Sequence, residues 1–244
     1  MRRVGIIDAT DLTIQAQQVS NVIYLITPIL AIIVMYVFFR RNQKNDFQGV
    51  IKVRGENCRD IWICIGIFIV AFVARFFHGV LTTPDGVNKV HLGLSLLPLH
   101  ICAGIAEEIV YRGIPVAVMM RGKPDSKRIR RVFLVTSILF SLMHLINGYG
   151  AGNTIVQLIA TFIMGMFWGA IYLRTGSILI TIVFHFLYDV FSNMMVLPDP
   201  IQTSNIVFLI FVQLLPIVLS IVIMRKSKLE EIKKTWAKIW NEQI

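Results

Sequence analysis

Apolar runs of about 20 residues alternate with short polar connections along most of the chain. The runs lie at Asn21–Phe39, Ile61–Val80, Leu92–Met120, Val132–Ile146, Thr154–Leu173, Ser177–Val196 and Asn205–Met224. Because a helix needs about 20 predominantly apolar residues to cross a bilayer, the pattern predicts a bundle of about seven transmembrane helices. The third run is too long for one straight crossing, and we expect Pro98 to separate its entry from its spanning part.

Composition strengthens this interpretation. Of the 244 residues, 56% are hydrophobic, and the mean hydropathy is +0.70, which is more apolar than is usual for a soluble domain. We therefore expect an all-α, multi-pass integral membrane protein. A prokaryotic cell membrane is a separate expectation that composition does not establish. Residues 1–20 would form an N-terminal segment, residues 21–224 the transmembrane domain and residues 225–244 a basic amphipathic tail.

The net charge of +10 resides mainly in the connections between spans. Three connections and the segment after the last span, all on one side of the seven-span arrangement, hold these cations: Arg40, Arg41, Lys44, Lys52, Arg54 and Arg59; Arg121, Lys123, Lys127, Arg128, Arg130 and Arg131; Arg174; and Arg225, Lys226 and Lys228. In the connections on the opposite side, Lys89 is the only cation. Cations favour the cytoplasmic side, so we predict an N-out, C-in topology with lipids, not nucleic acid, as partners of this charge.

The C-terminal tail has a helical pattern of its own. Leu229, Ile232, Trp236, Ile239 and Trp240 recur at helical spacing, and lysines occupy the opposite face. This predicts an amphipathic helix lying on the anionic inner leaflet. A helix that binds a partner protein is the alternative.

Acidic and basic residues interrupt the third run in "GIAEEIVYRG", residues 104–113. A charge near the bilayer centre costs at least ~2.5–3.5 kcal/mol, so these residues need a reason to be there. Glu108 and Arg112 are four residues apart, which predicts an ion pair on one helix face. Glu107 lies about 100° around the helix and has no intrahelical cation.

Two other runs carry histidines at membrane depth. His144 follows Phe140 by one helical turn, and His185 and Asp189 share one face of a later helix. Counting along the helices places Glu107 and His144 nearer the outer side and His185 nearer the inner side. Each histidine alone is as well explained by an interhelical hydrogen bond, but a carboxylate with two imidazoles is also a set that can activate water.

Three motifs taken in order resemble a known family. They are Glu107-Glu108-x-x-x-Arg112, Phe140-x-x-x-His144 and His185-x-x-x-Asp189. Together they resemble the CPBP family of intramembrane proteases, which includes type II CAAX prenyl endopeptidases and Abi-like bacteriocin-processing and self-immunity proteins. The helices that carry these motifs cover residues 92–196, whereas the zinc-protease motif H-E-x-x-H is absent from the sequence.

The resemblance implies a role for each residue. Glu107 would be the catalytic base, and His144 and His185 would bind and polarise the attacking water or a metal. Glu108, Arg112 and Phe140 would support them. Members are described both as metalloproteases and as metal-free glutamate-type enzymes, so a divalent metal such as zinc, held by Glu107, His144, His185 and Asp189, is one implied cofactor.

Asp189 departs from the prenyl-processing members, whose last motif ends in Asn. An ionised aspartate cannot donate a hydrogen bond to an oxyanion. It would instead orient His185 or act as a hard metal ligand. Prenylated substrates are accordingly less firmly implied than proteolysis.

We therefore expect an endopeptidase that cleaves a membrane-associated peptide or protein, such as a lipidated C-terminus, a leader peptide or a bacteriocin-related precursor. Two alternatives stay open. One is a non-catalytic membrane regulator or immunity protein of the same architecture, and the other is an ion-coupled carrier that uses the same buried groups. Gly165, Gly169 and Ala170 in the fifth run are expected to be helix-contact positions.

Overall fold

The computed structural model describes residues 9–43, 51–82, 94, 96–122, 124–147, 151–194 and 203–241. Its α-helices are α1 (Ala9–Gln43), α2 (Arg59–Thr82), α4 (Leu97–Glu108), α5 (Ile114–Met119), α6 (Ser126–Leu142), α7 (Ala151–Thr175), α8 (Ile178–Met194), α9 (Thr203–Ile223) and α10 (Leu229–Trp240). Shorter turns are η2 (Ile109–Gly113), η3 (Met143–Asn147) and η4 (Lys226–Lys228). The described part of the chain contains no strand, which confirms the all-α prediction.

Each predicted apolar run coincides with a helix or a continuous helical segment. The third run becomes α4, η2 and α5, and α4 begins at Leu97 with Pro98 in its first turn; part of the expected entry before Pro98 lies outside the described residues. Lys44, Lys89 and Lys123, together with the outer parts of the predicted terminal segments, lie outside the described residues.

Four helices are long and apolar enough to cross a membrane, among the residues that the structure describes. These candidate spans are Leu25–Asn42, Arg59–His78, Ser126–Ile146 and Gly152–Thr175. Ile178–Ser192 and Gln213–Ile223 are apolar but shorter. The membrane character is thus supported, whereas the total of seven spans and the N-out, C-in orientation remain predictions.

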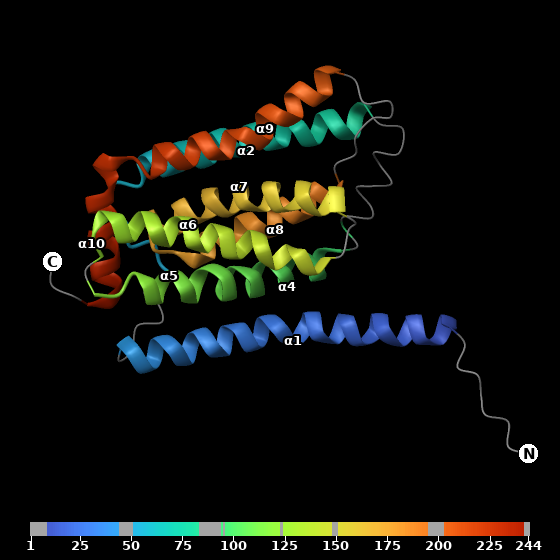
Figure 1. Cartoon of the computed structure of the whole chain (residues 1–244), viewed down its shortest axis with the longest axis horizontal. Coiled ribbons are helices and arrows are strands. Elements are labelled where there is room, and N and C mark those ends of the chain that lie inside the picture. Colours follow the sequence, from blue (N-terminus) through green and yellow to red (C-terminus); the bar gives the residue numbers. More distant parts are fainter. Residues whose placement is uncertain are drawn as a thin grey trace, which may run out of the picture.

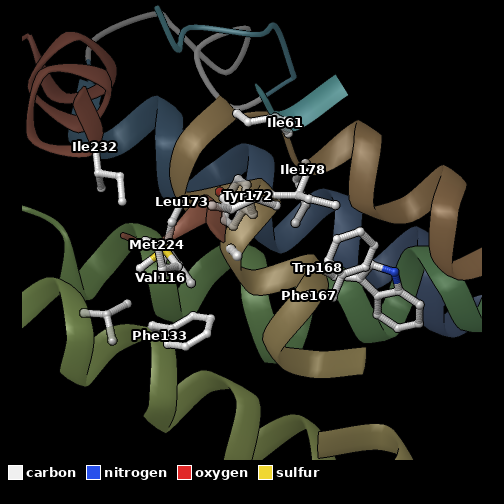
Figure 2. Close-up of a cluster of buried hydrophobic side chains, with 14 of the residues drawn as sticks. Ile61, Val116, Phe133, Phe167, Trp168, Tyr172, Leu173, Ile178, Met224 and Ile232 are labelled. Atoms are coloured by element: carbon white, nitrogen blue, oxygen red, sulfur yellow. The ribbon is translucent and has the colours of Figure 1, made fainter. Parts of the chain in front are cut away.

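The long helices run side by side, and α10 crosses one end of the bundle (Figure 1). Helix α7 lies centrally and packs against α6, α8 and α9, while α4 packs against α1 and α8. Phe167, Trp168, Tyr172 and Leu173 of α7 are almost fully buried in the core (Figure 2). The helix ends that flank the cation-rich connections all lie at the α10 end of the bundle (Figure 1), as the charge pattern requires.

Glycines allow the closest helix contacts. A Cβ at Gly165 of α7 would lie 3.3 Å from the Cα of Ser137 in α6, and the neighbouring Gly169 also faces Ser137. A Cβ at Gly104 of α4 would lie 3.3 Å from the backbone nitrogen of Phe186 in α8. The glycine contacts predicted for α7 are therefore present. The close contact at Gly104 brings together α4, which carries the two glutamates, and α8, which carries His185.

The C-terminal helix requires a correction. The apolar face of α10 is buried against the bundle and is therefore not free to contact the lipid of the inner leaflet. Its Trp236 indole donates a hydrogen bond to the carbonyl of Leu173 at 3.0 Å, and its Trp240 indole donates to the carbonyl of Ala117 at 3.1 Å. The amphipathic pattern identified a buried face correctly, but that face covers the ends of α5 and α7.

Arg174 also differs from its predicted environment. It was expected among the exposed topogenic cations, but its side chain is fully buried at the end of α7. Its Nη2 lies 2.7 Å from Glu231 Oε2 of α10 and 3.2 Å from Asp60 Oδ1 of α2. Its Nη1 donates to the carbonyl of Ile223 in α9 at 3.1 Å. One guanidinium thus connects α10 to three helices of the bundle.

Candidate active site

Glu107 and Glu108 lie at the end of α4, where the helix changes its hydrogen-bonding pattern. The backbone N–H of Ile114 donates to the carbonyl of Ile109, which is the five-residue spacing of a π-helix. Such turns often occur at functional sites, because the widened turn redirects side chains. Glu108 and Arg112, both fully buried, form the predicted ion pair across this turn.

Glu107 faces both histidines. Its Oε2 lies 3.8 Å from Nε2 of His185 and 4.0 Å from Nε2 of His144. This oxygen is buried and accepts no hydrogen bond from the residues that the structure describes. The depth difference expected from counting residues is therefore absent, and groups from α4, η3 and α8 converge.

The hydrogen bonds at Nδ1 fix how the two imidazoles are presented. Nδ1 of His144 lies 2.9 Å from the carbonyl oxygen of Phe140, which can only accept, so this nitrogen carries a proton and donates it. Nδ1 of His185 lies 3.0 Å from Glu108 Oε1, and the carboxylate likewise accepts. Both Nε2 atoms are consequently directed to the space beside Glu107.

Asp189 approaches the other nitrogen of His185. Its Oδ2 lies 3.4 Å from Nε2, on the same side of the ring as Glu107. Glu108, and not Asp189, therefore orients His185 through Nδ1. The sequence motif did not indicate this contact. Asp189 is placed at the nitrogen that faces the reactive space.

Aromatic rings enclose the polar cluster. Trp168 of α7 stacks on His185, with ring centroids 4.7 Å apart and an interplanar angle of 24°. Phe140 lies edge-on to both imidazoles, and the Arg112 guanidinium carbon lies 4.7 Å from its ring centroid. Phe140 thus occupies the supporting position predicted for it. Trp168 was not predicted as a site residue, although a bulky aromatic between Gly165 and Gly169 was a usable signal.

A small cavity of about 40 Å³ adjoins these groups. Its lining residues come from α6, η3, α7 and α8: Phe140, His144, Ala160, Thr161, Met164, Trp168, His185, Tyr188 and Asp189. One water needs roughly 10–15 Å³ of such volume and two or more polar partners, so the space suits one or a few waters. Imidazole and carboxylate groups supply those partners.

The described residues contain no group of three or more His, Cys, Asp or Glu side chains arranged to hold a metal ion. The four predicted ligands are nonetheless neighbours, with facing atoms 3.4–4.0 Å apart in the pairs His185–Asp189, His185–Glu107 and His144–Glu107. These spacings are close to those between ligands of one zinc ion, because Zn–N and Zn–O bonds are about 2.0–2.2 Å long, so Glu107, His144, His185 and Asp189 are the residues that would hold such an ion. We derive no step through a metal.

Residues 89–191 match the family model described as "Type II CAAX prenyl endopeptidase Rce1-like". The matched segment includes Glu107, His144, His185 and Asp189, and it confirms the predicted resemblance to the CPBP family. No curated protein and no solved structure matches the chain.

Proposed function

Starting from the Rce1-like segment at residues 89–191, we propose that the chain is an intramembrane endopeptidase in which Glu107 activates the attacking water. One observation carries this assignment. A buried carboxylate oxygen without a hydrogen-bond donor faces two imidazole Nε2 atoms whose Nδ1 positions are already engaged. Such an arrangement supports binding of a water molecule rather than helix packing alone.

In the proposed reaction, one water contacts Glu107 and both histidines from the same side, since the 3.8 and 4.0 Å separations leave no room directly between them. His144 Nε2 accepts one of its hydrogens, which orients the oxygen. Glu107 takes the other proton as the water oxygen bonds to the scissile carbonyl carbon. A tetrahedral intermediate forms, and its negative oxygen needs a donor.

His185 is the group that can supply this donor. Glu107, Glu108 and Asp189 provide three carboxylates around it, against the single cation of Arg112. A proton on Nε2 of His185 is thus compensated, and it would donate to the oxyanion. The proton held by Glu107 then passes to the leaving nitrogen as the C–N bond breaks, which gives a carboxylic acid and an amine.

The substrate is proposed to be a membrane-associated peptide or protein. Many helical faces around the site expose apolar side chains such as Ile138, Leu142 and Leu187, which suits a lipid environment. Whether the substrate carries a prenyl group is tested by peptides of one sequence made with and without that group.

The central experiment compares wild-type protein with the variant Glu107→Gln in liposomes that contain these quenched fluorescent peptides. Loss of a general base costs about 10²–10⁴ in rate, so cleavage should fall to background. The matched control is Glu230→Gln, because Glu230 is exposed on α10 and pairs only with Lys233 among the described residues. Full cleavage by folded Glu107→Gln protein would overturn the assignment and favour a regulatory role.

A further inference from the structure

A groove of about 360 Å³ lies between α6 and α9, away from the candidate active site. Phe133 and Leu134 of α6, Ile221 of α9 and Met224, which follows α9, supply its apolar walls, and Ser220 of α9 is a fully buried lining residue. The volume falls in the range of roughly 300–1,000 Å³ that is typical of sites for small ligands.

Cations surround one end of this groove. Arg130 of α6, Arg225 and Lys226 complete its lining, and all three are exposed. Arg225 also contacts Asp60, with Nη2 3.4 Å from Oδ2, so part of its charge is already balanced. Within the described residues no ion pair joins Arg130 or Lys226 to an acidic group.

The combination of an apolar trough and a cationic rim matches the chemistry of an anionic amphiphile. Leu134 and Ile221 remain 46% and 62% exposed, so the trough opens outward along a candidate membrane span. The rim lies at the end of the bundle that holds α10, where the other cation-rich connections also lie (Figure 1). Acyl chains would contact the walls while the headgroup pairs with Arg130 and Lys226.

We propose that this groove is a binding site for an anionic phospholipid of the adjacent leaflet. The site is separate from the catalytic residues. Arg130 and His144 lie at opposite ends of the α6–η3 segment, roughly 20 Å apart at 1.5 Å per residue. The inference does not depend on the proposed protease activity, since the groove exists whether or not Glu107 is catalytic.

The test measures lipid bound to the purified full chain by native mass spectrometry, with phosphatidylglycerol and phosphatidylcholine of identical acyl chains. A basic residue near a membrane surface contributes about 1 kcal/mol, which corresponds to a roughly fivefold preference per cation. We expect phosphatidylglycerol to be preferred, and Arg130→Gln and Lys226→Gln each to lower that preference about fivefold. Arg131→Gln is the matched control, because Arg131 is the exposed next residue on α6 but does not line the groove.

A second pair of variants tests the walls. Ile221→Trp should fill the trough and reduce binding of phosphatidylglycerol, whereas Val218→Trp, one turn away on α9 and outside the groove, should not. Folding of each variant is checked by its elution volume and circular dichroism. Equal losses for Arg130→Gln and Arg131→Gln would overturn the proposal in favour of general surface charge.

Two competing ligands test the alternatives to a phospholipid in this groove. Inorganic phosphate that displaces the lipid at millimolar concentration would indicate an anion site without a chain-binding groove. A prenylated peptide that displaces it more strongly than the same peptide without the prenyl group would assign the groove to substrate. Either result would contradict the phospholipid assignment, while failure of both to compete supports it.

Discussion

Removal of the cation from the Glu108–Arg112 pair provides the most informative test of how the polar cluster is held inside the bundle. Both side chains have no solvent exposure, and Arg112 also lies over the rings of Phe140 and Trp168. The substitution Arg112→Met retains most of the apolar stem but leaves Glu108 buried beside His185 alone. It therefore isolates the contribution of the positive charge.

The expected magnitude follows from the burial. Breaking a fully buried pair by removal of one partner costs about 3–5 kcal/mol, because the remaining charge is left uncompensated. In a chain of this length each 1 kcal/mol lowers the midpoint of thermal unfolding by roughly 2–4 °C. Arg112→Met should thus lower the midpoint by about 6–20 °C.

The assay is thermal unfolding in detergent of the wild type, Arg112→Met, Glu108→Gln and the double variant. If the loss comes from an uncompensated carboxylate, the double variant should be more stable than Arg112→Met alone. Lys233→Met controls for loss of a cation, since the exposed Lys233–Glu230 pair contributes no more than about 0.5 kcal/mol. At roughly 2–4 °C per 1 kcal/mol, a shift of less than about 2 °C corresponds to a loss of under about 1 kcal/mol. An unfolding midpoint of Arg112→Met that close to the wild-type midpoint would refute the reasoning.

Three further outcomes are expected. Trp168→Ala should cost about 3–5 kcal/mol of stability and most of the cleavage rate, because it removes the ring stacked on His185. Trp168→Phe should retain more stability and more cleavage than Trp168→Ala in the same unfolding and cleavage assays. Arg174→Met should loosen α10, because it removes the guanidinium that joins Glu231 to Asp60 and leaves Glu231 with only its local pair to Lys228 among the described residues; limited trypsin digestion should then release the C-terminal segment faster than in Lys233→Met. Cleavage by protein treated with a chelator should be retained, since no step of the proposed reaction uses a metal; activity that is lost and then restored by zinc would contradict this.

The sequence predicted the helices and the polar cluster well, because each depends on a local pattern. Apolar runs determine where helices form, and residues four apart on one helix face, such as Glu108 and Arg112, can be paired by inspection. Glu107, His144 and His185 could be placed on helices in the same way. The distances between these three residues could not be predicted from the sequence, because they depend on helix tilt, the turn η3 and the glycine contact at Gly104.

The contacts that the sequence did not reveal are between distant segments. A tryptophan in an apolar run has the same local pattern whether it faces lipid or, as Trp168 does, an imidazole. The stripe on α10 predicts that one face is buried, but it does not identify the covering surface. In the sequence, Arg174 has the pattern of a cation in a connection between spans. Its partners Asp60 and Glu231 are distant in sequence, so only the fold shows that it is buried and paired.

The most direct measurement for the central claim is the cleavage rate of Glu107→Gln alone and combined with His144→Ala or His185→Ala, all in the same liposomes. Groups that act on one water should show non-additive losses. We predict that Glu107→Gln reduces cleavage by about 10²–10⁴-fold and that either histidine substitution then adds little. Losses that multiply independently, or substantial cleavage by folded Glu107→Gln protein, would contradict a single catalytic water held by these three residues.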